Sequence, residues 1–172
     1  PYRVIKILLD TFCDCKQNAF SDSNLLTNQD PQGWTALHIA VLYGVEDEAL
    51  LLIIDACSIY GALSIRNEFG WTPLLLALRY GSSTRIIKAL LEADVSSVTI
   101  ANQSGTSPLF MRWCAWQKID NVLARSAIAF NPRTSIHAVD NPNNLSGSFR
   151  KCWDDMLCLL KAASFHYEAK LH

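Results

Sequence analysis

The side chains that could do chemistry in this chain are its cysteines and histidines, and their spacing limits what that chemistry can be. The six cysteines are Cys13, Cys15, Cys57, Cys114, Cys152 and Cys158, and the four histidines are His38, His137, His166 and His172. A structural zinc site needs closely spaced ligand pairs, but no Cys-x-x-Cys occurs and the histidines lie far apart. We therefore expect buried or inert thiols, no metal and no cofactor, with a metal or redox pair at Cys13 and Cys15 as the alternative.

The remaining sequence gives no sign of an enzyme. A nucleophile beside its base, a pair of carboxylates and a phosphate-cradling glycine loop are all absent. The net charge is −1 and lysine and arginine do not cluster, which argues against binding to nucleic acid. Charged residues interrupt the apolar stretches, so we expect no membrane span. The sequence predicts a non-enzymatic, intracellular and cytoplasmic protein with no evident small-molecule substrate.

The strongest pattern in the sequence is an internal repeat. Residues 33–44 recur at 70–81, and a weaker copy begins at Gly105. The glycines that open the three copies are 37 and 35 residues apart, a period typical of helical solenoids. Half of the residues are hydrophobic, which supplies the core that stacked units need. The repeat therefore indicates a protein that binds through a stacked surface.

Each copy carries the local signals of a turn followed by a short helix. A polar residue three places before the opening glycine favours a turn, and a hydroxyl two places after it favours a helix N-terminus. Proline stands at the first helical position in the second and third copies, and a glycine follows the helix in the first and second copies. The polar residues are Asp30, Asn67 and Asn102, and the opening glycines are Gly33, Gly70 and Gly105. The hydroxyls belong to Thr35, Thr72 and Ser107, the prolines are Pro73 and Pro108, and the helix-ending glycines are Gly44 and Gly81.

A longer amphipathic helix is predicted after each short one. The pattern is clearest at 84–94, and similar segments occur at 2–10, 48–56 and 155–162. Residues 63–66 and 98–101 alternate apolar and polar side chains, which predicts short extended arms before the next turn.

The pattern loosens after Gly105. Residues 109–116 predict an aromatic first helix, and 119–129 either extend it or form a separate helix. Residues 131–147 are rich in helix breakers and predict a loop. A helix returns at 149–167, where the spacing predicts that Trp153, Met156, Leu157, Leu159 and Leu160 face the core.

The segment Asp30-Pro31-Gln32-Gly33-Trp34-Thr35-Ala36-Leu37-His38-Ile39-Ala40 resembles the ankyrin repeat, D-x-x-G-x-T-P-L-H-x-A. The resemblance implies an all-α helical solenoid of stacked helix-turn-helix repeats with short hairpin loops, and a structural bridge at His38. It divides the chain into a truncated repeat with an inserted loop (1–27), repeats at 28–64 and 65–99, and a degenerate repeat at 100–172 with an insertion around 131–148. Since the chain starts at Pro1 and residues 2–10 lack a first helix, we expect a piece of a longer array.

The resemblance also implies a protein-interaction module that binds a protein partner through its hairpin tips and the concave face of its first helices. Aromatic residues and arginine, the types enriched at binding hot spots, give the candidates Trp34, Trp71, Phe69, Tyr43, Tyr80 and Arg79. The tryptophans could instead pack over the hairpin below and contribute stability alone. A second alternative is a purely structural spacer in a longer protein whose function lies in another domain.

Overall fold

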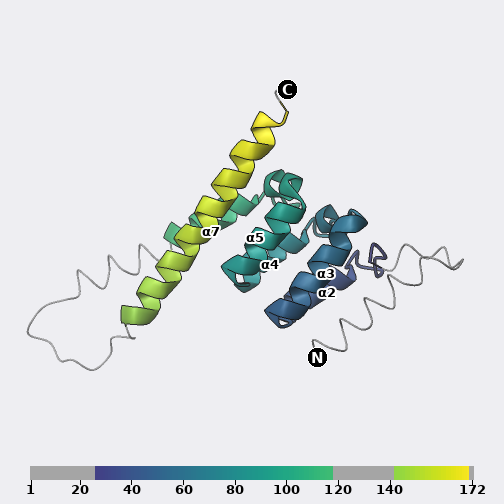
Figure 1. The fold of residues 1–172 in the computed structure, drawn as a ribbon, viewed down its shortest axis with the longest axis horizontal. Helices are drawn as coiled ribbons and strands as arrows, with labels where there is room; N and C mark the ends of the chain where they lie inside the picture. Colours follow the sequence, from purple (N-terminus) through teal and green to yellow (C-terminus); the bar gives the residue numbers. More distant parts are fainter. Residues whose placement is uncertain (1–25, 118–141, 171–172) are drawn as a thin grey trace, which may run out of the picture.

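The computed structural model describes residues 26–117 and 142–170, and within these ranges no strand occurs. The helices follow one another in pairs along the chain (Figure 1). The pairs are α2 (Ala36–Leu42) with α3 (Asp47–Ile59), α4 (Pro73–Tyr80) with α5 (Thr84–Ala93), and helical residues 108–117 with α7 (Pro142–Glu168). Two short 3-10 helices, η2 (Ala62–Ser64) and η3 (Val95–Thr99), follow the first two pairs.

Equivalent helices of successive pairs pack against each other. α2 packs against α4, α3 against α5, and α5 against α7, so first helices and second helices form two layers. Figure 1 shows the pairs side by side, with α7 at one end of the array. The core between the layers includes Leu37, Leu50, Ile54, Leu74 and Leu90. The predicted all-α helical solenoid is confirmed.

The predicted caps explain where the short helices begin and end. Thr35 and Thr72 accept hydrogen bonds from the third residue of α2 and of α4, and Pro73 opens α4. Gly44 and Gly81 follow these helices with φ of 63° and 77°, a region that favours glycine. Helices of seven and eight residues are marginal in isolation, so their stability depends on stacking.

The hairpin turns are built alike in the three copies. One side-chain oxygen of Asp30, Asn67 and Asn102 accepts two backbone N–H bonds from the residues two and four places ahead, at 2.8 to 3.0 Å. Neighbouring turns are also joined, because the amide of Glu68 donates to the carbonyl of Gln32 at 3.1 Å and the amide of Gln103 donates to Phe69 at 3.2 Å. The turns therefore form a continuous backbone ladder along the array.

At two of the turn glycines, the neighbouring turn lies so close that no side chain fits, and both glycines also have a positive φ. A Cβ on Gly33 would lie 2.9 Å from the Cα of Asn67, and one on Gly70 would lie 2.7 Å from the amide nitrogen of Gln103. Gly105 has a similar φ of 74°, but no atom lies within 4 Å of the place its Cβ would take. Among the residues that the structure describes, no further turn packs against the glycine of the third turn.

Three local predictions are wrong. Residues 63–64 and 98–99 lie in η2 and η3, and the extended backbone begins only at Ile65 and Ile100. α7 starts at Pro142, inside the predicted loop, because proline is well tolerated in the first turn of a helix. Of the five α7 residues predicted to face the core, Met156 and Leu159 are buried, but Trp153, Leu157 and Leu160 are exposed.

Several predictions fall on residues that the structure does not describe. They are the helix at 2–10, the loop that follows it up to residue 25, the Cys13 and Cys15 pair, the segment at 119–129, His137 and His172.

Candidate functional site

Tyr43 and Tyr80 line one open groove between the first two repeats. Tyr43 caps the C-terminus of α2 and Tyr80 is the last residue of α4, and the two residues are 79% and 56% exposed. The groove measures about 390 Å³ and is lined by the glycine turns that follow the two helices. Ser83 donates a hydrogen bond of 2.5 Å to Asp47 in its wall, which joins the second helices of the two repeats.

Of the other predicted binding residues, three lie at the hairpin end of the first helices, and Arg79 lies in the last turn of α4. Phe69 is exposed at the tip of the second turn, whereas Trp34 and Trp71 are half-buried and pack against the core. The ring of Trp34 meets the ring of His38 edge-on at 6.0 Å. The Arg79 guanidinium lies 5.7 Å from the centre of the Trp71 ring, in cation–π geometry.

The structure therefore divides the six predicted residues between two places. Trp71 precedes α4 and Tyr80 ends it, so about 12 Å of helix separates them at 1.5 Å per residue. Arg79 reaches back from the C-terminal turn of α4 toward Trp71. The burial of the two tryptophans favours their alternative role in stability, while Tyr43, Phe69 and Tyr80 remain available for contact.

His38 joins the first repeat to the second. Its Nε2 lies 3.0 Å from the carbonyl oxygen of Trp71, and the amide of Thr35 donates to its Nδ1 at 3.1 Å. Both contacts are satisfied by the neutral ring with its proton on Nε2. Burial lowers the pKa of His38, which favours the same neutral form. The residue has the geometry of a structural link rather than that of a catalytic base.

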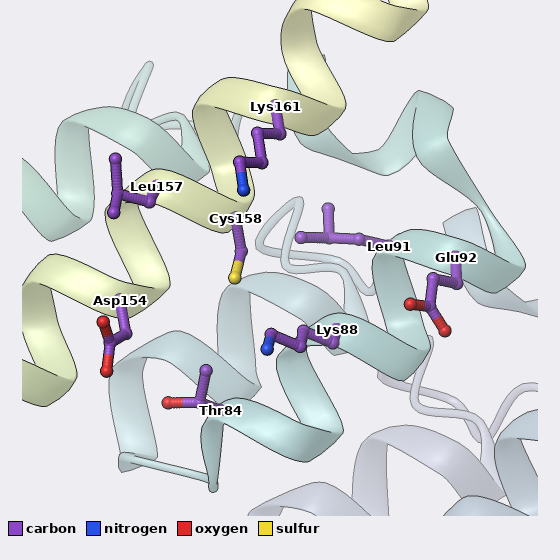
Figure 2. Close-up of a pocket in the computed structure, with 8 residues that line it drawn as sticks. All are labelled: Thr84, Lys88, Leu91, Glu92, Asp154, Leu157, Cys158 and Lys161. Carbon is purple, nitrogen blue, oxygen red and sulfur yellow. The ribbon is translucent and has the colours of Figure 1, made fainter.

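A second groove, which the sequence analysis missed, lies between α5 and α7 (Figure 2). It measures about 500 Å³ and is lined by Thr84, Lys88, Leu91 and Glu92 of α5 and by Asp154, Leu157, Cys158 and Lys161 of α7. Each wall carries one basic and one acidic side chain. Burial raises the pKa of the Cys158 thiol, an effect that the charge of Lys88 partly opposes. A thiol shifted in this direction is not activated as a nucleophile.

A buried ionic cluster around Asp155 was also missed. Asp155 is fully buried and lies 3.3 Å from Arg112 and 2.9 Å from Lys151, and Thr84 donates to it at 2.7 Å. Arg112 also donates to the carbonyl of Leu78 at 2.8 Å. The cluster fastens α7 to the second and third repeats. One signal was available, because Arg112 stands where the repeat has alanine in its first two copies.

The thiols and possible metal ligands give no further site. Cys57 is buried, and this burial raises its pKa to about 11. Across residues 26–117 and 142–170, no three metal-binding side chains come together. None of the helices in these two ranges is long and apolar enough to cross a membrane.

The family model described as ankyrin repeat matches residues 69–97. This segment begins in the second hairpin turn, contains α4 and α5, and ends within η3. No curated protein matches the chain. The predicted resemblance is confirmed, and residues 69–97 form an ankyrin repeat.

Proposed function

We propose that this ankyrin-repeat chain is a non-enzymatic protein-interaction module whose contact surface centres on the groove between Tyr43 and Tyr80. Ankyrin repeats typically serve protein–protein interaction. The observation that carries the proposal is that two successive repeats present an exposed tyrosine at the same end of the first helix, and both side chains line one groove.

The chemistry of the groove suits a protein ligand. Tyrosine offers a large apolar face and a hydroxyl while losing little side-chain entropy, which is why it is frequent in binding surfaces. Gly44 and Gly81 leave backbone accessible between the two rings. Phe69 and Arg79 extend the proposed surface toward the hairpin tips, with Trp34 and Trp71 supporting them from below.

The test compares the proteins captured by two forms of the purified chain. Replacing Tyr43 and Tyr80 together with serine should remove the specific partners from the captured set, because both aromatic contacts are lost. A matched control is Phe165→Ser on α7, since the exposure of Phe165 lies between those of Tyr43 and Tyr80 but the residue lies outside the groove. Unchanged thermal melting would show that the double variant remains folded. Retention of the same partners by the folded double variant would contradict the proposed surface.

A structural spacer is the second candidate function. The backbone ladder between the hairpin turns favours it, because this ladder stacks the repeats without using any exposed aromatic side chain. Exchange of residues 28–99 for unrelated ankyrin repeats of the same length separates the two candidates. A spacer should tolerate the exchange, whereas an interaction module should lose its partner.

A further inference from the structure

The exposed side of α7 carries an apolar stripe, in addition to the apolar residues that this helix buries. Its residues are Trp153, Leu157, Leu160, Ser164 and Tyr167, separated by four, three, four and three positions. The four apolar members are 44%, 37%, 46% and 62% exposed. Alternating steps of four and three are the spacing with which one helix packs along another in a coiled coil. We name these five residues the α7 stripe.

The α7 stripe is exposed, and one of its members, Leu157, borders the groove between α5 and α7. Asp155, which is fully buried against the array, lies on the opposite side of the helix at 3.6 residues per turn. α3 packs against α5 and α5 against α7, and among the described residues the apolar members of the α7 stripe stay exposed. Figure 1 shows α7 at the end of the array, projecting beyond the neighbouring helices.

The first helix of the third repeat is uncovered at the same end. Phe110 and Trp113 are 54% and 45% exposed. Their equivalents in the second repeat, Leu75 and Leu78, are at most 3% exposed. The third repeat therefore presents apolar surface at positions that the preceding repeat buries, and an apolar surface of this kind indicates an interaction site.

We propose that a second copy of this chain covers the α7 stripe with its own α7, so that the two helices pack antiparallel about a two-fold axis between Leu157 and Leu160. The flanking charges favour this occupant. Asp154 and Lys161 lie seven residues apart on the same flank of the stripe. In the antiparallel pair, Asp154 of each copy lies opposite Lys161 of the other, and two ion pairs form. In a parallel pair, Lys161 would instead face the uncharged Met156.

The groove between α5 and α7 leaves room for this flank of the pair. Figure 2 shows Asp154, Leu157 and Lys161 on the α7 wall of the groove, across from α5. The α5 wall contributes Lys88 and Glu92, one charge of each sign, so it does not oppose a second helix that also carries one acidic and one basic residue. A two-fold pair of this kind is closed and does not propagate into a filament.

Sedimentation equilibrium of the purified 172-residue chain at low salt tests the proposal. The expected mass is twice the 19.2 kDa of one chain. Leu160→Lys should weaken the dimer by about 10-fold or more in Kd, because it buries a charge in the centre of the stripe. Phe165→Lys is the matched control, since it removes an exposed aromatic side chain of α7 that lies off the stripe, and it should leave the mass unchanged.

Charge exchange tests the antiparallel arrangement. Asp154→Lys and Lys161→Asp should each weaken the dimer by placing like charges together, and the double variant should recover it. Circular dichroism of each variant checks that the helices remain formed. A monomeric wild type, an assembly larger than a dimer, or a dimer that tolerates Leu160→Lys would overturn the proposal. A folded double variant that dimerises as weakly as the single variants would also overturn the proposal.

Discussion

Arg112 Nη2 lies 3.3 Å from Asp155 Oδ2, in an ion pair that joins the first helix of the third repeat to α7. The Arg112 side chain is only 10% exposed and that of Asp155 is fully buried. Thr84 and Lys151 complete the hydrogen bonding of the carboxylate. The pair fixes which side of α7 faces the array, and therefore which side is left for other contacts.

Asp155→Ala should destabilise the protein strongly. The substitution leaves the buried Arg112 without its counter-ion, which typically costs about 3 to 5 kcal/mol. Urea unfolding followed by circular dichroism measures the change. Lys151→Ala is the control, because the Lys151 side chain is 35% exposed and Arg112 still neutralises Asp155 in this variant, so the loss should be smaller. Equal losses in the two variants would show that the Arg112 pair is not the anchor of α7.

Gly70→Ala should cost more stability than Gly105→Ala. Both variants strain a backbone with φ near 75°, at a cost of about 1 kcal/mol. Only at Gly70 does the new methyl group also collide with the backbone of the next turn, which adds about 1 to 3 kcal/mol. Chemical denaturation of both variants gives the difference. If Gly105→Ala were the more damaging, the third turn would be in close contact on its far side.

His38 should make the stability of the array depend on pH. Burial lowers its pKa below the ordinary value of 6.5, so below about pH 6.5 the unfolded chain binds a proton that the folded protein does not. Stability is therefore expected to fall as the pH is lowered from about 7 to about 5.

His38→Leu provides the comparison, because leucine occupies the equivalent position, Leu75, in the second repeat. The melting temperature of this variant should change less with pH over the same range than that of the wild type. Identical pH profiles would exclude His38 as the source of the effect.

The thiols should differ in their reactivity. Cys57 is fully buried with a pKa of about 11, so it should resist alkylation at about pH 8 in the folded protein. Cys114 is half-buried and should react sooner. Peptide mass spectrometry after a timed exposure to iodoacetamide measures both sites. The same treatment in urea should remove the difference, and early labelling of Cys57 without urea would contradict the packing around α3.

The candidate site could be predicted only in part. The sequence placed Tyr43 and Tyr80 near the ends of their helices, and the structure places them there. The sequence also grouped the tyrosines with Trp34 and Trp71 on one face. In the structure, the two tryptophans lie at the other end of the helices and pack against the core. The direction of a half-buried ring depends on the neighbouring repeat, and that information is not local.

The hairpin turns and the caps of the short helices α2 and α4 were determined by the sequence alone, because each depends on bonds within about four residues. The two bonds that Asn67 accepts in its own turn and the bond from Leu75 to Thr72 are of this kind. Tertiary structure decided which side of α7 is buried. Apolar residues such as Met156 and Leu160 occur on more than one side of this helix, so its periodicity could not choose between them. The choice follows from Asp155, because a buried carboxylate must face its partner, and Arg112 lies far away in the sequence.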